Sequence, residues 1–275
     1  YKRQDVYRTI MRQKLLFMQA PTGVGKTIST IFPAVKAVGE ELADRIFYLT
    51  AKTITATVAK ETFALLEKNG YRAKTIQITA KEKLCPCDEM ECNPVTCPYA
   101  KGHFDRVNDA VFDLLHRCEM IERDDILSQA DRYTVCPFEL CLDTASWCDN
   151  VICDYNYVFD PNVYLKRFFQ EGIKGDYIFL IDEAHNMVER SRQMYSAQIY
   201  KEDFLTVKRI MKEHSRSIEK ALEKCNKILL GMKRECENYT VYDTFGNMVF
   251  SFMRLMTLLD LSLIHISEPT RPISI

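Results

Sequence analysis

The sequence predicts an α/β fold built around a parallel β-sheet. A Gly-rich turn joins one apolar run to a helical segment, and an Asp-Glu pair directly follows another apolar run. Segments with helical periodicity separate the remaining apolar runs, and this alternation favours a parallel sheet flanked by helices. The runs with the length and composition of buried strands are Arg45–Thr50, Thr75–Thr79, Asn150–Asp154 and Tyr177–Ile181.

The predicted helices follow from apolar spacing and from stop signals. A short helix over Tyr1–Met11 carries Gln4, and a helix over Thr27–Val38 ends at Gly39. Asn69 and Gly70 end the helix that follows the Arg45–Thr50 strand. The other segments with helical spacing are, in chain order, Thr53–Lys68, His103–His116, Val163–Phe169 and Asp203–Met232.

The Gly-rich turn has the composition of a phosphate-binding loop. It reads Ala20-Pro21-Thr22-Gly23-Val24-Gly25-Lys26-Thr27, after an apolar run at 15–18 that we expect to be a strand. Glycines let backbone N–H groups approach phosphate oxygens, and a helix that starts here points its positive end at them. Lys26 then reaches the β- and γ-phosphates, and the Thr27 hydroxyl holds Mg²⁺. The alternative is an ordinary Gly-containing turn before a helix.

A second motif, Asp182-Glu183-Ala184-His185, follows the run at 177–181. We expect Asp182 to hold the Mg²⁺ through water and Glu183 to orient and polarise an attacking water. Phosphoryl transfer depends mainly on positioning and charge stabilisation, so these few groups suffice. An Asp-Glu pair after a strand is common in loops, but its combination with this phosphate loop is not. The two motifs therefore predict a site that binds and hydrolyses ATP.

Cysteines cluster between the second and third predicted strands. Cys85, Cys87, Cys92 and Cys97 lie among prolines, and Cys136 precedes Pro137. Prolines and turn-forming residues hold a loop open so that several sulfurs converge, and four thiolates are what a [4Fe–4S] cluster requires. A zinc site with four cysteines is the chemical alternative. The remaining six thiols are expected to be small apolar side chains: Cys118, Cys141, Cys148, Cys153, Cys225 and Cys236.

The Asp203–Met232 segment predicts one long amphipathic helix capped by Asp203. Its apolar residues alternate in steps of three and four from Phe204 to Met232, with His214 the one exception in the seam. A single helix cannot bury such a seam, so we expect it to pack against a second helix.

Composition sets broad limits on function. The chain has 275 residues, 47% of them hydrophobic, and a formal net charge of −1, so any nucleic-acid path must be a local groove. It contains no apolar run of membrane-spanning length and no secretory signal, and its 11 clustered cysteines favour a reducing, cytoplasmic location. The start at Tyr1 and the adapter-like residues 261–275 lead us to expect a fragment with a non-native tail.

Several of these pieces occur together in one known family. They are Gln4, the phosphate loop, Leu49–Thr53, the cysteines from Cys85 to Cys136, Tyr155-Asn156-Tyr157, and Asp182 to His185. These pieces occur in the same order as in the iron–sulfur DNA helicases of superfamily 2, the XPD/DinG-like group, which the chain resembles. Ala20, where the general phosphate-loop pattern has Gly, is common in nucleic-acid helicases.

The resemblance implies a RecA-like P-loop NTPase domain with an iron–sulfur insertion and a helical arch insertion. It implies Cys85, Cys92, Cys97 and Cys136 as cluster ligands, with Cys87 as the substitute for Cys85 or Cys92. It further implies that Gln4 contacts adenine and that the Leu49–Thr53 segment grips the DNA backbone. The implied divisions are 1–80 and 149–189 for the motor domain, 81–148 for the insertion, 190–260 for the start of the arch, and 261–275 for the tail.

The function implied is that of an ATP-dependent, monomeric DNA helicase moving 5′ to 3′ along single-stranded or forked DNA in repair or replication. Its cofactors are ATP, Mg²⁺ and a [4Fe–4S] cluster, and no membrane is involved. We expect the fragment alone to be inactive, because a second motor domain is missing. We also expect loss of the cluster to loosen residues 85–136. Two alternatives are a nucleotide-dependent switch that binds DNA without unwinding it, and a zinc-stabilised nucleic-acid-binding module.

Overall fold

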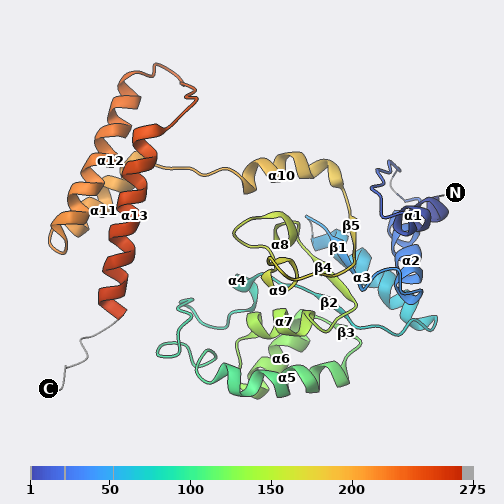
Figure 1. The fold of residues 1–275 in the computed structure, drawn as a ribbon. Coiled ribbons are helices and arrows are strands. Elements are labelled where there is room, and N and C mark those ends of the chain that lie inside the picture. Colours follow the sequence, from blue (N-terminus) through green and yellow to red (C-terminus); the bar gives the residue numbers. More distant parts are fainter. Residues whose placement is uncertain (1, 22, 52, 268–275) are drawn as a thin grey trace. The chain divides into compact units, whose positions relative to one another are not determined.

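The computed structural model describes residues 2–21, 23–51 and 53–267, without the side chains of residues 2, 53, 54 and 261–267. Within it the chain divides into two compact units, Tyr1–Ser196 and Ala197–Ile275 (Figure 1). The first unit is an α/β domain and the second is helical. None of the helices in the described part of the chain is long and apolar enough to cross a membrane.

The first unit is built on a five-stranded sheet in the order β3-β2-β4-β1-β5. Every ladder in it is parallel, as the alternation of apolar runs and helices predicts. The strands are β1 (Arg45–Leu49), β2 (Thr75–Gln77), β3 (Met120–Ile121), β4 (Asn150–Cys153) and β5 (Tyr177–Ile181).

Helices of the first unit occupy the connections. They are α1 (Lys2–Met11), α2 (Lys26–Gly39), α3 (Thr53–Lys68), α4 (Lys81–Leu84), α5 (His103–Arg117), α6 (Arg123–Tyr133), α7 (Pro137–Ala145), α8 (Asn156–Phe159), α9 (Lys166–Phe169), the 3₁₀ helix η1 (Ala184–Asn186) and α10 (Met187–Met194). The helix expected over Val163–Phe169 is shorter than predicted and begins only at Lys166.

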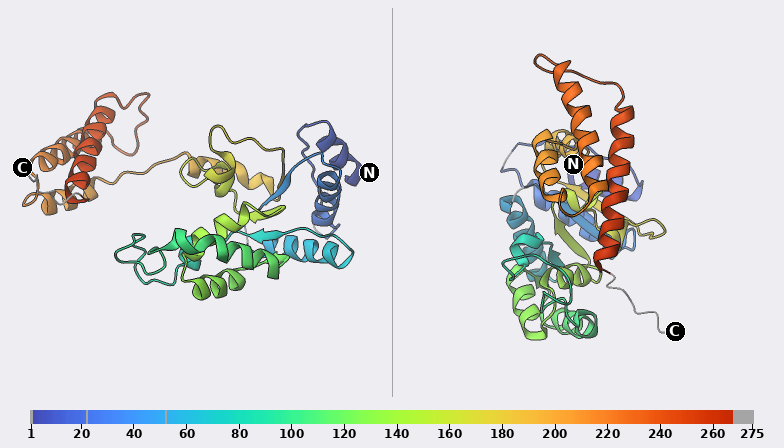
Figure 2. Two further views of the ribbon diagram at one scale, coloured as in Figure 1. Left: turned by 60° about the horizontal axis from the view of Figure 1, so that its bottom comes forward. Right: turned by 90° about the vertical axis from the view of Figure 1, so that its left-hand side faces the viewer.

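The two faces of the sheet are buried against different helices, because side chains alternate along each strand. On one face Tyr48 and Ile152 pack with residues of α2 and α3. On the other, Phe47 and Val151 pack with residues of α5, α6 and α7. These three helices lie together on one side of the sheet (Figures 1 and 2). The sheet therefore forms the middle of three layers.

The helices α5 to α7 are an integral part of this core. Leu114, Ile126 and Leu140 are each at most 1% exposed and share one apolar cluster with Phe47 of β1. The expectation that loss of a cluster would loosen all of 85–136 assumed few other contacts there, whereas apolar packing holds residues 103–136. Within 85–136, the long stretch without a helix or strand is residues 85–102, between α4 and α5.

The strand expected at 15–18 is not formed, which corrects that prediction. None of the five strands of the described sheet pairs with it. Leu15 and Phe17 are 87% and 88% exposed. A strand requires a hydrogen-bonding neighbour, and the edge strand β5 pairs within this sheet only with β1.

The second unit consists of α11 (Lys201–Met211), α12 (Arg216–Arg234) and α13 (Gly246–Ser267). The single helix predicted over Asp203–Met232 is wrong, because the chain turns at 212–215 and Ser215 caps a new helix by accepting from the Ile218 N–H. His214, the residue that broke the seam, lies in this turn. Asp203 lies in the first turn of α11 and is not its cap, which is Tyr200.

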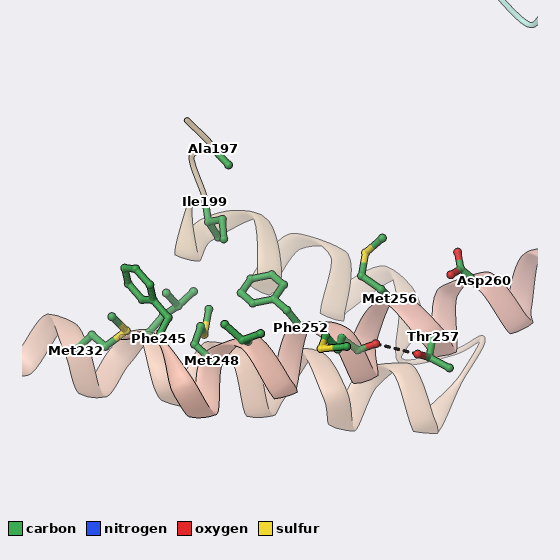
Figure 3. A pocket seen from close by; sticks show the side chains of 12 residues that line it. Ala197, Ile199, Met232, Phe245, Met248, Phe252, Met256, Thr257 and Asp260 are labelled. Carbon is green, nitrogen blue, oxygen red and sulfur yellow. Dashed lines mark hydrogen bonds between the residues drawn. The ribbon is translucent and has the colours of Figure 1, made fainter. Parts of the chain in front are cut away.

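Much of the predicted seam is nevertheless buried between helices, although Val207 is 39% exposed. Phe204 of α11 and Ile218 of α12 pack with Leu255 of α13 in one apolar cluster. A cavity of about 790 Å³ also opens in this unit. Figure 3 shows its lining, which includes Ile199, Phe252 and a set of methionines. This cavity is apolar and lies outside the unit that carries the phosphate loop.

Candidate functional site

The phosphate loop adopts the backbone shape that its glycines allow. Gly23 and Gly25 have φ values of 80° and 71°, in the left-handed region that other residues enter at a cost. Gly25 is the N-cap of α2, whose first residue is Lys26. The helix thus begins at the residue expected to reach phosphate, with its free N–H groups beside the loop. Val24 is exposed on the loop, and Thr22 lies outside the described residues.

The two predicted motifs meet in space. The Nζ atom of Lys26 lies 3.1 Å from Oε1 of Glu183, although 157 positions separate them in the sequence. Lys26 starts the helix after the loop, and Glu183 follows β5 by two residues. The structure therefore brings together a cation suited to a γ-phosphate and a carboxylate suited to polarise water.

Asp182 and Thr27 are linked by a residue that the sequence analysis did not single out. The side chain of buried Tyr48 lies close to both the Asp182 carboxylate and the Thr27 hydroxyl, which both influence its pKa. Burial, and then the charge of Asp182, raise the pKa of Tyr48. Both expected magnesium ligands thus lie within reach of one phenolic oxygen. They are hard oxygen donors of the kind that Mg²⁺ prefers, so the pair fits that ion.

Glu183 has a strained backbone. Its φ and ψ are 51° and 44°, a left-handed conformation that costs a non-glycine residue about 1–2 kcal/mol. Asn186 stabilises it by donating from Nδ2 to the Glu183 carbonyl at 3.0 Å. His185 Nδ1 lies 3.4 Å from the Glu183 carboxylate. Strain of this kind at a residue with a chemical role is frequent in active sites.

Two further positions from the sequence analysis lie near this site. Gln4 is exposed on α1, which packs along α2 with the Arg3 guanidinium 5.8 Å from the Phe32 ring centroid. At the end of β1, the hydroxyls of Thr50 and Thr55 are hydrogen-bonded to each other. The expected contacts of these segments with adenine and DNA remain predictions. Lys52 lies outside the described residues.

The cysteine-rich loop gathers several thiols. Cys87 is close enough to Cys85 and Cys97 to hydrogen-bond to both, and burial together with these neighbours raises its pKa to about 11. The Lys81 ammonium lies close to the sulfurs of Cys92, Cys85 and Cys136, and these neighbours, Cys92 first, raise its pKa. A cation beside sulfurs stabilises their thiolate form. The preference for Cys85 over Cys87 as the first ligand thus stays a prediction.

The sulfur of Cys136 lies at the N-terminus of a helix. Cys136 is the N-cap of α7, so its sulfur lies beside the backbone N–H groups of Phe138 and Glu139, which partly offset the rise in its pKa that burial causes. Its own N–H donates to Nδ1 of the buried His103 at 3.2 Å. This contact requires His103 to be unprotonated at Nδ1, in line with a pKa that burial lowers. His103 was not predicted, since no local pattern marks a histidine that contacts a residue 33 positions away.

The chemistry of this donor set fits a thiolate-bound metal or cluster. The four expected ligands, Cys85, Cys92, Cys97 and Cys136, are soft donors linked through Lys81 and Cys87. Among the described residues, no group of three or more His, Cys, Asp or Glu side chains is arranged to hold a single metal ion. In a [4Fe–4S] cluster each thiolate binds its own iron, whereas all four thiolates of a zinc site share one ion.

The other six cysteines behave as core residues or as their neighbours. All eleven cysteines are free thiols. Cys118 and Cys236 are half-buried, and the remaining four are buried, as the sequence analysis expects of structural thiols: Cys141, Cys148, Cys153 and Cys225.

Comparisons with known proteins agree with the family resemblance and with the fold. The model of the DEAD_2 family matches residues 58–204, more than half of the chain. The yeast (Saccharomyces cerevisiae) general transcription and DNA repair factor IIH helicase subunit XPD/RAD3 is 23% identical over 217 residues, which are 66% of this chain and 28% of that protein. A Fanconi anemia group J protein homolog from Gallus gallus is 29% identical over 76 residues, which are 28% of this chain and 6% of that protein.

Solved structures show the same fold. One described as an XPD helicase superposes with a TM-score of 0.58 at 15% identity, over 94% of this chain and 50% of that one. A truncated XPD superposes with a TM-score of 0.55 at 15% identity, over 96% and 76% of the two chains. The chain thus spans about a quarter of the yeast relative and much less of the chicken relative. It is XPD-like in sequence and fold, and it belongs to the DEAD_2 family.

Proposed function

We propose that this chain carries the first motor domain of an ATP-dependent DNA helicase that moves 5′ to 3′ along single-stranded DNA, in repair or replication. The observation that carries the proposal is the meeting of Lys26 and Glu183 at 3.1 Å. An ordinary Gly-containing turn has no reason to face an Asp-Glu pair from another strand. The resemblance to the XPD protein adds the helicase context.

Each residue of the two motifs has its own role in the proposed binding and hydrolysis of ATP. Backbone N–H groups from Gly23 to Thr27 hold the phosphates of ATP, and Lys26 balances charge on the transferring group. Thr27 and Asp182 would hold Mg²⁺, which supplies further charge neutralisation. Glu183 accepts a hydrogen bond from the attacking water and so aims it. Gln4 contacts adenine, and the second motor domain expected from the resemblance completes the site.

The cysteine loop would hold a [4Fe–4S] cluster through Cys85, Cys92, Cys97 and Cys136. Its part is structural, because it would fix the loop 85–102, which lies between α4 and α5 and has no regular structure. By resemblance to the family, this loop helps to separate the strands of a DNA duplex. Free thiols of this kind fit a reducing compartment, the cytoplasm.

A strand-displacement assay tests the helicase activity. The full-length protein is mixed with Mg²⁺, ATP and a duplex that bears either a 5′ or a 3′ single-stranded overhang. We expect displacement with the 5′ overhang, and none with Lys26→Ala. Hydrolysis of ATP stimulated by single-stranded DNA, without displacement of either duplex, would favour the nucleotide-dependent switch instead.

Metal analysis tests the cluster. Protein purified without oxygen should be brown and contain about four irons per chain. Ser in place of Cys85, Cys92, Cys97 or Cys136 should remove the colour, because a hydroxyl is a poor ligand for a soft iron–sulfide core. Cys118→Ser is the matched control and should keep both colour and iron. A colourless protein that contains zinc and unwinds DNA fully would refute the assignment.

A further inference from the structure

Tyr155 lies directly beneath the turn that carries Asp182 and Glu183. It follows β4 by two residues, and its side chain is 0% exposed within the core shared with α5 to α7. Its hydroxyl, in contrast, leaves that core and donates to the backbone carbonyl of Asp182, with the Glu183 carbonyl oxygen at 3.3 Å. Burial, and then the charge of Asp182, raise the pKa of Tyr155 to about 12, so this hydroxyl remains a donor.

The turn above Tyr155 needs such a donor. Glu183 has the left-handed backbone described above, and its own carbonyl already accepts from the Asn186 N–H and from Asn186 Nδ2, each at 3.0 Å. The carbonyl that takes its hydrogen bond from Tyr155 is that of Asp182, at the start of the turn. That conformation also sets where the Glu183 carboxylate goes, which is 3.1 Å from the Lys26 ammonium. A turn that relaxed to an ordinary conformation would move this carboxylate while leaving β5 intact.

A second contact holds the same two segments together. Arg190 of α10 donates from one nitrogen to both oxygens of the Asp154 carboxylate, at 2.9 Å and 3.0 Å. Asp154 immediately precedes Tyr155, and Arg190 follows the Asp182–Glu183 turn. The end of β4 is thus fixed against the turn on two sides, by a buried phenol and by a charged pair.

We infer that Tyr155 is a positioning residue for ATP hydrolysis: its hydroxyl holds the Asp182–Glu183 turn so that the Glu183 carboxylate faces the transferring phosphate. The inference rests on the proposed ATPase function and adds to it a residue outside the two nucleotide motifs. Tyr155 touches neither nucleotide nor water in this role. It acts only through the backbone of the turn, so its loss should lower the rate of the chemical step and leave nucleotide binding intact.

The test is Tyr155→Phe in the full-length protein, which removes one oxygen and keeps the buried ring. We expect kcat for ATP to fall about tenfold, as loss of one hydrogen bond of roughly 1.4 kcal/mol gives. The KM for ATP and the affinity for a fluorescent ATP analogue should stay within about twofold of wild type. Tyr157→Phe is the matched control, since Tyr157 is a buried tyrosine of the same segment and core. It should leave kcat unchanged.

A double-mutant cycle separates positioning from general stability. If Tyr155 acts through Glu183, then Tyr155→Phe should not lower the residual single-turnover rate of Glu183→Gln any further. A full tenfold additional loss in that background, or an unchanged kcat in Tyr155→Phe alone, would overturn the inference. Loss of nucleotide affinity in parallel with a lower melting temperature would also overturn it, because the hydroxyl would then serve the fold as a whole. The proposed function itself fails separately, if the wild-type protein hydrolyses no ATP or Lys26→Ala hydrolyses it normally.

Discussion

Lys26→Ala separates the chemical role of the phosphate loop from its structural role. Lys26 is the first residue of α2, where alanine is a good helix former, so the helix itself loses nothing. The one ion pair that the structure gives this side chain joins it to Glu183 at 3.1 Å. The substitution therefore removes this pair and the cation expected at the phosphates.

The expected cost in stability is small. The side chains of Lys26 and Glu183 are 30% and 35% exposed, so solvent screens the pair, and ion pairs of this kind contribute about 0.2–1 kcal/mol. For a chain of this size that corresponds to at most about 4 °C in melting temperature. The expected cost in catalysis is larger, because the lysine charge acts on the phosphoryl group as it transfers. We expect at least a tenfold loss of ATPase activity, or about 1.4 kcal/mol in barrier height.

The assay is steady-state ATP hydrolysis by the full-length protein with single-stranded DNA present, paired with thermal unfolding of each variant. Lys36→Ala is the matched control, because Lys36 lies on the same helix and forms an exposed pair with Glu40 at 3.7 Å. It should leave hydrolysis unchanged. If Lys26→Ala keeps more than about a tenth of the wild-type rate, its assignment as the phosphate-binding lysine is wrong.

Three further outcomes follow from the same geometry. Glu183→Gln should bind a fluorescent ATP analogue normally but hydrolyse ATP at least about tenfold more slowly, since an amide cannot polarise water; failure to bind would make Glu183 structural. Gly23→Ala and Gly70→Ala should each lower the free energy of unfolding by about 1 kcal/mol in urea, because both glycines have positive φ and an added methyl group meets no neighbour. Only Gly23→Ala should also weaken nucleotide binding. Ile218→Asp should cost a few kcal/mol, because Ile218 is 1% exposed, whereas Asp at the 59%-exposed Ile210 should be nearly neutral.

Apolar periodicity predicted the sheet where the strands are buried on both faces. The central strands β1 and β4 have uninterrupted apolar residues, and both were expected within one residue of where they lie. The run at 15–18 has the same composition but forms no strand, since pairing depends on a neighbour and not on the run itself. β3 was missed because two residues, Met120 and Ile121, carry no periodic signal.

The helical seam shows a related limit. The spacing of Phe204, Ile218 and Cys225 correctly predicted which side chains are buried. It did not predict the turn at 212–215, because a seam continues in register across a short break between two packed helices. Ser215 was the available signal, since serine is a preferred N-cap, and His214 just before it was the one residue that did not fit the seam.

The nucleotide motifs could be predicted because each is a short local pattern. The residues that connect the two motifs in space could not be predicted in this way. Lys26 and Glu183 carry short motifs with known chemistry, so their meeting could be expected. Tyr48 and Tyr155 instead act through hydroxyls at the ends of buried aromatic side chains. In sequence they resemble any core tyrosine at a strand end. The sheet order β4-β1-β5 is needed to show that both hydroxyls lie near Asp182, which directly follows β5.

The cysteine segment contains expected ligands in an irregular loop and one expected ligand that is fixed by distant contacts. A bound cluster would therefore affect these two parts differently. Three of the four expected ligands lie in the loop 85–102, which has no helix or strand and is held by local hydrogen bonds such as that from the Thr96 N–H to the Asn93 side chain at 3.0 Å. The fourth, Cys136, is fixed by α7, by His103 and by the apolar core. A cluster would therefore tie an irregular loop to a rigid anchor. Its loss should loosen the loop and leave α5, α6 and α7 folded, because their packing against the sheet does not involve the sulfurs.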